Sequence, residues 1–171
     1  MAETYIISDT HFGHANSLTF LRDDGTKLRD FSSVTEMDEY MIHRGNSVVR
    51  PEDKVIHLGD VAINRRCLKL LSLLNGKKKL IMGNHDIFKL EDYTQYFYDV
   101  KAYRVFDGHV FSHIPVHPSS IERWKGNVHG HLHDKKLDDP RYICMSVEQE
   151  HVNYTPVPWY LVKEILSKQN P

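Results

Sequence analysis

Three short apolar runs in the first half of the chain predict buried β-strands, and polar residues follow each of them at once. The runs occupy residues 4–8, 54–58 and 79–82. Their length is typical of strands, and the stretches between them have a helical pattern, which predicts alternating α and β elements. In sheets of this kind the carboxyl ends of the strands form the edge at which ligands bind.

Two stretches between these runs have the spacing of amphipathic helices. Ser33 and Glu36 form a capping-box pattern that predicts the start of the first helix. Its apolar stripe is Met37, Tyr40 and Met41. The second predicted helix carries apolar residues at i, i+3, i+4 and i+7, and Asn75-Gly76 is expected to end it; these residues are Cys67, Leu70, Leu71 and Leu74.

The second half of the chain is richer in predicted strands. Residues 100–106 and 109–112 flank Asp107-Gly108, a pair typical of a tight hairpin turn. Further strands are expected at Val128 and over residues 142–147. A closing helix with Pro158 near its start has an apolar face made of Trp159, Val162, Ile165 and Leu166. We therefore predict an α/β fold: a four-layer α-β-β-α sandwich, with two mixed sheets face to face and helices outside, as a single domain over residues 1–171.

The composition is that of an ordinary globular protein. Of 171 residues, 40% are hydrophobic and 26% are charged, and the formal net charge is −1. This balance gives no overall basic character that would indicate a nucleic-acid binder, although a local basic groove is left open. Cys67 and Cys144 lack metal-finger spacing, so we expect small buried residues in a reducing compartment. No signal peptide and no membrane span is predicted, and a cytoplasmic location is the default expectation.

Candidate metal ligands follow each predicted strand of the first half and recur near residue 131. The groups are Asp9-Thr10-His11, Gly59-Asp60, Gly83-Asn84-His85-Asp86 and Gly130-His131-Leu132-His133. Oxygen and nitrogen donors of these types bind hard-to-borderline divalent metals. Taken singly, Asp9 also fits a capping residue and Asp60 a plain turn residue. Their regular placement at strand ends favours one metal centre and metal-assisted hydrolysis of a phosphate ester.

The residue types within these groups indicate roles. Asn84 offers a neutral oxygen ligand, and His85 can act as an acid or as an electrophilic stabiliser. Asp86 is expected to orient His85, as carboxylates near a metal often orient histidines. In an extended segment His131 and His133 would lie on the same side, which favours metal binding by both.

With His113 as one further ligand, these donors occur in the order found in a known family. The chain resembles the calcineurin-like metallophosphoesterases, which are dinuclear metal hydrolases, from Asp9 to His133. The resemblance is specific because five separated motifs keep their order with compatible spacing, and residues 9–16 are similar to small bacterial and phage members. It implies that His85 contacts the scissile phosphate and helps the leaving oxygen without binding metal. It also implies the ligand sets: Asp9, His11 and His133 for one metal, Asn84, His113 and His131 for the second, and Asp60 bridging both.

The charge of such a centre suits a phosphate substrate. Two divalent cations, the carboxylates of Asp9 and Asp60, and a bridging hydroxide leave roughly one net positive charge. Metal ions also lower the pKa of bound water to around 7, which predicts in-line attack by a metal-bridging hydroxide. No serine or cysteine nucleophile is required. Two divalent metal ions are therefore the expected cofactors, with manganese favoured and iron, zinc or nickel as alternatives.

Three further residues are candidate substrate contacts. His14 lies close to the first motif and is expected to touch substrate or to orient a ligand. Arg44 could hold a phosphate oxygen with two hydrogen bonds, although such an arginine more often pairs with a surface acid. His117 could line the substrate cleft, and a loop histidine without a contact is the alternative.

The sequence determines the substrate less well than the metal centre. Loops 19–31 and 115–127 are expected to set specificity, and Trp124 could stack on a base or pack within its loop. We predict a phosphodiesterase acting on a small phosphate ester, with a small or cyclic nucleotide as one candidate. The alternatives are a phosphomonoesterase, a nuclease, or a binding scaffold without catalysis. A nucleic-acid partner is not favoured, and the oligomeric state is open.

Overall fold

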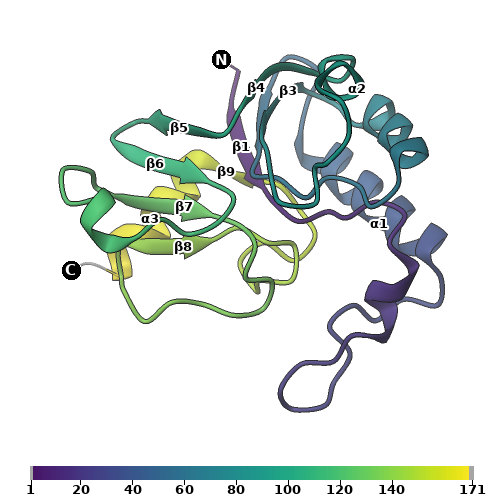
Figure 1. Cartoon of the computed structure of the whole chain (residues 1–171), viewed down its shortest axis with the longest axis horizontal. Coiled ribbons are helices and arrows are strands. Elements are labelled where there is room, and N and C mark those ends of the chain that lie inside the picture. Colours follow the sequence, from purple (N-terminus) through teal and green to yellow (C-terminus); the bar gives the residue numbers. More distant parts are fainter. Residues whose placement is uncertain (1, 170–171) are drawn as a thin grey trace.

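The computed structural model describes residues 2–169, and its first sheet has five strands. Their order is β4-β3-β2-β1-β9, where β1 to β4 run parallel and β9 pairs antiparallel with β1 (Figure 1). This sheet contains all three strands predicted in the first half of the chain. The bounds are β1 Thr4–Ile7, β2 Lys54–His57, β3 Lys77–Ile81, β4 Phe97–Lys101 and β9 Val157–Pro158.

The second sheet has four strands in the order β5-β6-β7-β8. The β5–β6 pair is antiparallel and turns at Asp107 and Gly108, which both have positive φ angles, as the predicted tight hairpin requires. The pairs β6–β7 and β7–β8 are parallel, so this sheet is also mixed. The bounds are β5 Tyr103–Phe106, β6 His109–Ser112, β7 Gly126–His129 and β8 Tyr142–Cys144.

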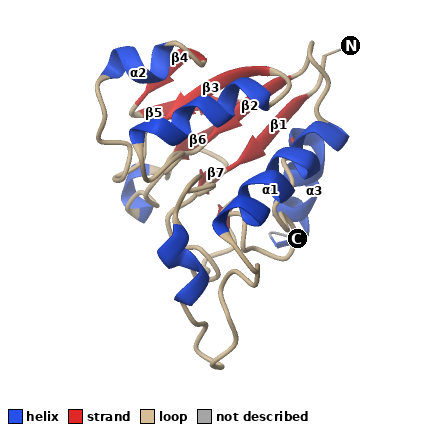
Figure 2. Ribbon diagram, turned by 90° about the vertical axis from the view of Figure 1, so that its right-hand side faces the viewer, coloured by secondary structure: helices blue, strands red, loops and turns tan. Residues whose placement is uncertain are grey.

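Helices cover the outside of the sheets. Figure 2 shows α1 on the near side of the first sheet beside β1 and α2 beside β4 at the opposite edge, with the second sheet behind. The predicted fold class, two mixed sheets face to face with helices outside, is confirmed. The helical elements are η1 Ala15–Thr19, α1 Val34–Val48, η2 Arg65–Leu73, α2 Leu90–Thr94, η3 Pro118–Ser120 and α3 Trp159–Gln169.

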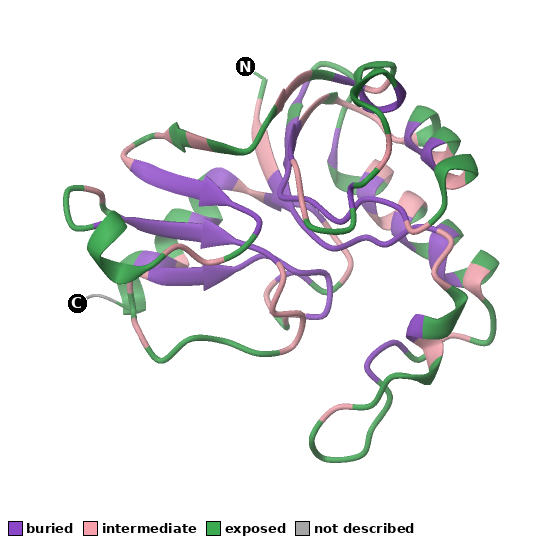
Figure 3. Ribbon diagram, viewed as in Figure 1, coloured by how far each residue is buried: buried purple, intermediate pink, exposed green. Residues whose placement is uncertain are grey.

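The main apolar core is continuous between the two sheets. One cluster joins Ile6 and Leu80 of the first sheet to Phe111 and Val128 of the second. Trp159, the first residue of α3, extends this cluster through ring contacts with Phe111 at 5.2 Å. Strands β6, β7 and β8 are buried along their whole length, whereas β5 is partly exposed (Figure 3). The sheets therefore pack through their shared interior.

The predicted strand over residues 100–106 is wrong as a single element. It is divided at Ala102 into the end of β4, which pairs with β3, and the whole of β5, which pairs with β6. The two parts thus belong to different sheets. A local apolar pattern cannot show this division, because it depends on which partner each half finds. The short helix α2 was also not predicted.

The second predicted helix forms, but as the 3₁₀ helix η2 rather than an α-helix. Its two buried residues, Leu68 and Leu71, are three positions apart, which is one turn of a 3₁₀ helix. The expected end is confirmed by Gly76, which has a φ angle of 85°. At the first helix Ser33 caps the N–H of Glu36, while the Glu36 carboxylate accepts from Ser32 instead of completing the box on Ser33.

The carboxyl ends of the strands meet where the sheets come together. Ser8, which follows β1, forms a parallel bridge with Ser146, which follows β8. The donor groups after β1, β2, β3 and β6 therefore approach each other from both sheets. None of the helices in the described part of the chain has the length and apolar character needed to cross a bilayer.

The buried face of η2 predicts a difference between two leucines of the same helix. Leu71 is fully buried and Leu73 is 56% exposed. We expect Leu71→Ala to lower the free energy of unfolding by about 2–5 kcal/mol, because it leaves a cavity in the core. Leu73→Ala should change it by at most about 0.5 kcal/mol. Urea denaturation measures both, and equal losses would contradict the observed helix orientation.

Candidate metal centre

Six potential ligands converge into two groups of three. One group is Asp9, His11 and His133, and the other is Asp60, His113 and His131. Within each group the candidate ligand atoms lie within 4.8 Å of one another. The two groups are adjacent, since His11 Nε2 lies 3.5 Å from Asp60 Oδ2. The fold thus brings four separated sequence motifs to one place.

Five of these six residues have an unusual backbone. Among the described residues eight other than glycine have a positive φ angle. Most of them are candidate ligands: Asp9 (59°), His11 (46°), Asp60 (55°), His131 (69°) and His133 (53°). The chain bends sharply at such residues, which keeps the donors close to the strand ends. Unusual backbone of this kind is concentrated at functional sites in proteins.

Two glycines allow the loops of the centre to approach each other closely. A Cβ atom on Gly83 would collide with the carboxylate of Asp60 and lie 2.5 Å from its backbone nitrogen. A Cβ atom on Gly130 would lie 2.5 Å from Asp9 Oδ2 and overlap Ser8. Gly83 therefore allows a close approach to the Asp60 turn, and Gly130 plays the same part on the opposite sheet.

The first group contains buried polar atoms without a hydrogen-bond partner. Asp9 Oδ2 accepts from the N–H of His131 at 3.0 Å and from the hydroxyl of Ser146 at 2.7 Å. By contrast, Asp9 Oδ1 and both ring nitrogens of His11 have none. Buried polar groups are rarely left unpaired in proteins, so these atoms fit a bound cation.

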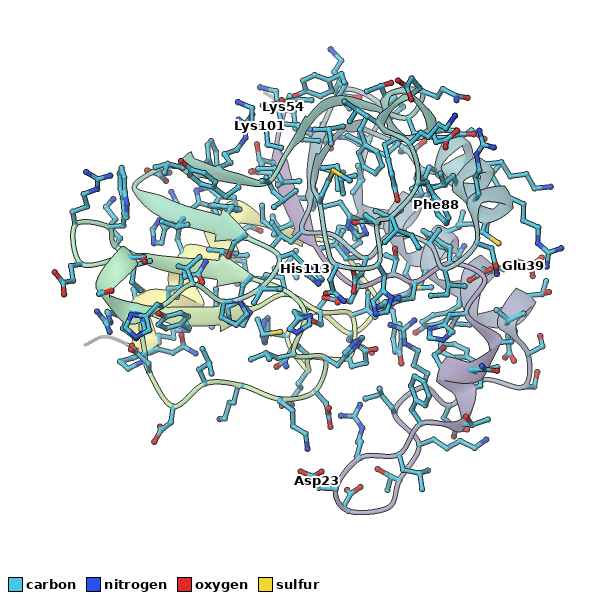
Figure 4. All side chains as sticks on the ribbon, in the orientation of Figure 1. Asp23, Glu39, Lys54, Phe88, Lys101 and His113 are labelled. Carbon is cyan, nitrogen blue, oxygen red and sulfur yellow. The ribbon has the colours of Figure 1, made fainter. Side chains whose placement is uncertain are left out.

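The second group is held with its ligand atoms facing inward. His113, labelled in Figure 4, lies where the two sheets meet. Its Nδ1 donates to the carbonyl of Leu58 at 2.7 Å, which leaves Nε2 directed to the centre. That Nε2 lies 3.3 Å from Asp60 Oδ2 and 2.9 Å from Asn84 Oδ1. The amide oxygen of Asn84 therefore joins the second group, as the resemblance implies.

A buried ion pair supports His133. The ring Nδ1 lies 3.0 Å from Glu148 Oε1, so the opposite nitrogen is free to bind a metal. The guanidinium of Arg29 pairs with the same carboxylate oxygen at 2.6 Å and also donates to the carbonyls of Asp9 and Thr10. Arg29 thus connects the Asp9-Thr10-His11 segment to Glu148, the carboxylate that contacts His133.

Burial and neighbouring charges shift the pKa values of the candidate ligands in both directions. Burial, and next the Arg29 charge, lower the pKa of His11, so its imidazole is neutral. Burial raises the pKa of Asp60, but its hydrogen bonds with His113 and the His85 N–H, together with the charges of His113 and His11, outweigh burial and make the net direction downward. For Glu148 burial also acts upward, and Arg29 holds its pKa at about 2. The carboxylates of Asp60 and Glu148 are therefore ionised at neutral pH. Burial instead raises the pKa of Asp9, and hydrogen bonds with Asp60 and Glu148 raise the pKa values of His113 and His133 against the effect of burial.

Asp86 does not orient His85, and this prediction is corrected. Both oxygens of Asp86 accept from backbone N–H groups, at Asp60 (2.8 Å), Val61 (3.0 Å) and Gly83 (2.8 Å). A carboxylate saturated in this way clamps the turn after β2 to the loop after β3. Asp86 is therefore a positioning residue for the bridging-ligand turn.

His85 stands beside the first group. Its ring lies 5.5 Å from that of His11, and its backbone N–H donates to Asp60 Oδ1 at 2.9 Å. The side chain is exposed and is not among the residues of either ligand group. This placement is compatible with the predicted contact to phosphate, and the role stays a prediction.

The three candidate substrate residues have different places. His14 lies at the centre, with its ring 5.6 Å from that of His11. Arg44 donates to the hydroxyl of Thr155 at 2.8 Å instead of facing the ligands. His117 is in an exposed loop and contacts Ser119, away from the ligand groups. The structure therefore supports only His14 as a neighbour of the site.

The sequence did not reveal every residue of the centre. Arg29 and Glu148 were not predicted, because a lone arginine and a lone glutamate have no motif around them. Only their complete burial, at 1% and 7% exposed, distinguishes them. In addition, His131 and His133 are not in an extended segment as expected, and their left-handed backbone directs them into different ligand groups.

Comparisons with known proteins agree with this geometry. The family model described as calcineurin-like phosphoesterase matches residues 3–171. An uncharacterised protein of Methanocaldococcus jannaschii is 33% identical over 183 residues, which cover 98% of this chain and 93% of that protein. The crystal structure of a protein of unknown function from Aquifex aeolicus has a TM-score of 0.76 at 24% identity, covering 96% of this chain and 100% of that one.

The chain belongs to the calcineurin-like phosphoesterase family. The family assignment implies a metal-dependent phosphoric ester hydrolase, and the two ligand groups provide a place for two metal ions. The predicted resemblance is thereby confirmed. Neither relative's description names an activity, so the reaction beyond this class is taken up below as a proposal.

Glu148 should affect metal binding without touching the metal. Glu148→Gln removes the charge behind His133, and we expect the affinity for Mn²⁺ to fall about 10–100-fold. Isothermal titration of the metal-free protein measures this. Glu150→Gln, an exposed glutamate two positions away, is the matched control and should leave the affinity unchanged. Equal affinities in the two variants would show that the Glu148–His133 contact has no part in binding.

Proposed function

We propose that this protein hydrolyses a small phosphodiester with the help of two divalent metal ions. The observation that carries the proposal is the pair of adjacent ligand groups with unpartnered buried atoms at Asp9 and His11. These buried atoms have no hydrogen-bond partner, and a bound cation would supply the missing interaction. When bound, two divalent cations supply a hydroxide nucleophile at neutral pH and stabilise negative charge on phosphate oxygens.

The residues of the chain organise the rest of the reaction. Asp60 lies between the groups, 3.5 Å from His11 Nε2 and 3.3 Å from His113 Nε2, which suits a ligand shared by both ions. His85 is held by its backbone to the same carboxylate, so its imidazole is carried on a firmly placed loop. From there it would contact the phosphate and donate a proton to the leaving oxygen. His14 borders the same space.

The finer assignments within this function are predictions. Diester substrates are preferred to monoesters, and a nuclease with the same centre is the alternative. Manganese is the favoured ion, and iron, zinc or nickel are the alternatives because mixed nitrogen and oxygen donors accept several divalent metals. The ligand set is complete, which argues against a scaffold that has lost catalysis. A small phosphate ester as the partner and a cytoplasmic location also stay predictions.

Replacing the shared carboxylate should impair metal binding and turnover together. Asn at position 60 keeps an oxygen that can accept from His85, but it removes the charge between the two groups. We expect Asp60→Asn to reduce bound manganese, measured by elemental analysis after gel filtration, and to abolish hydrolysis of bis(p-nitrophenyl) phosphate. Asp23→Asn is the control, since Asp23, labelled in Figure 4, is exposed at the tip of a loop. Full activity in Asp60→Asn would refute the shared-ligand role.

Replacing His85 should separate turnover from metal binding. His85 is not in either ligand group, so His85→Ala should retain its manganese. Loss of an acid catalyst lowers kcat by about 10²–10⁴-fold, and we expect a loss in that range. His43→Ala, an exposed histidine on α1, is the matched control. Unchanged kcat, or loss of metal with loss of activity, would show that the role given to His85 is wrong.

A further inference from the structure

A cleft of about 650 Å³ opens beside the metal centre. Asn84 and His113, which belong to the second ligand group, also line this cleft, so the two spaces are continuous. Its size lies within the range of sites for small organic ligands, about 300–1,000 Å³. A phosphate bound at the metals would therefore carry its attached organic group to the entrance of this cleft.

The walls of the cleft are apolar and aromatic. They come from β5, β6 and the loop that leads to β7, and include Tyr103, Val105, Val110, Ile114, Val116 and Trp124. Tyr103 is 64% exposed, and Val105 and Ile114 are 40% and 52% exposed. Large apolar side chains left open to water in a concave site indicate a ligand that covers them.

Trp124 and Arg123 add a flat surface and a positive charge. Trp124 packs against the small apolar cluster of Val110, Ile121 and Tyr142, which holds its ring in place. The Arg123 guanidinium lies over the indole, 5.1 Å from the ring centroid. No Asp or Glu is among the described residues that line the cleft. A planar ring joined to an anionic phosphate fits both features.

The other clefts of the molecule are less suitable. One, lined by His117, Leu137 and Asp139 among others, includes none of the candidate ligands. Another contains Asp134, Glu148 and Glu150 beside Arg22 and Lys136, and it also includes none of the candidate ligands. The aromatic cleft alone among these three combines apolar walls with a direct opening to the ligand groups.

We propose that this cleft binds an aromatic ring of nucleobase type attached to the phosphate, so that nucleotide diesters are preferred to alkyl diesters. Trp124 and Tyr103 provide the ring contacts, and Arg123 complements the negative charge of the substrate. The proposal rests on the proposed function for its reaction, but the cleft itself is a binding site that is testable without catalysis. It also gives loop 115–127 its role in specificity.

Two substrates with the same leaving group test the proposal. Thymidine 5′-(p-nitrophenyl phosphate) and methyl p-nitrophenyl phosphate both release p-nitrophenol, and they differ in the group that stays on the phosphate. The manganese-loaded protein should have a higher kcat/KM for the thymidine ester. In Trp124→Ala the ratio of the two kcat/KM values should fall about tenfold, as expected when one stacking surface is lost. Tyr103→Ala, at an exposed position, should lower the same ratio.

Conservative and remote variants separate binding from folding. Trp124→Phe keeps an aromatic face and should restore most of the ratio, whereas Tyr160→Ala removes an exposed tyrosine of α3 outside the cleft and should leave it unchanged. A ratio near one in the unmodified protein would overturn the proposal. So would an equal loss on both substrates in both Trp124→Ala and Tyr103→Ala.

A binding measurement tests the cleft independently of the proposed hydrolysis. Thymidine 5′-monophosphate should quench the tryptophan fluorescence, and Trp124→Phe should remove the response because Trp159 is buried. If neither ester is hydrolysed but the quenching occurs, the proposed function fails and the cleft stands. If both esters are hydrolysed equally and no quenching occurs, the cleft fails and the proposed function stands.

Discussion

The structure depends on a backbone that bends sharply at the candidate ligands. Residues with left-handed φ angles cost about 1–3 kcal/mol each and persist only where their surroundings hold them. Here Arg29 donates to the carbonyls of Asp9 and Thr10, and Asp86 accepts from the N–H groups of Asp60 and Val61. Arg29 and Asp86 both hold backbone groups through hydrogen bonds from an ionisable side chain, and both side chains are buried. The ligand turns are thus stabilised from outside the centre before any metal is present.

The two sheets contribute different parts of the site. The first sheet contributes short turns after parallel strands, and the second contributes histidines from the segments that follow β6 and β7. The junction at Ser8 and Ser146 brings them together, and the Asp9 carboxylate accepts from Ser146 at that junction. The same sheet that supplies His113 also forms the aromatic cleft, so chemistry and substrate recognition share β6. Changes in β5 and in loop 115–127 could therefore alter specificity without disturbing the ligand turns.

The segment 19–31 shows how a surface loop can serve the interior. It projects from the body of the molecule in Figure 1, and its tip at Asp23 is exposed. We expected this loop to set substrate specificity. That role stays a prediction. The returning arm of the loop places Arg29 in the core, where it pairs with Glu148 and holds the first donor motif. Breaking such a buried pair leaves an uncompensated charge, which links the loop to the stability of the centre.

The sequence by itself determined the first three strands, the main amphipathic helices and the ligand candidates, because strand ends, capping residues and donor types are local patterns. It predicted the hairpin at Asp107-Gly108 and the donor residues that meet in the two groups. Only the tertiary structure decided the division of residues 100–106 between sheets, the clamp role of Asp86 and the partnership of Arg29 with Glu148. These features join residues far apart in the chain, and their energy comes from burial and pairing, which exist only once the two sheets are packed.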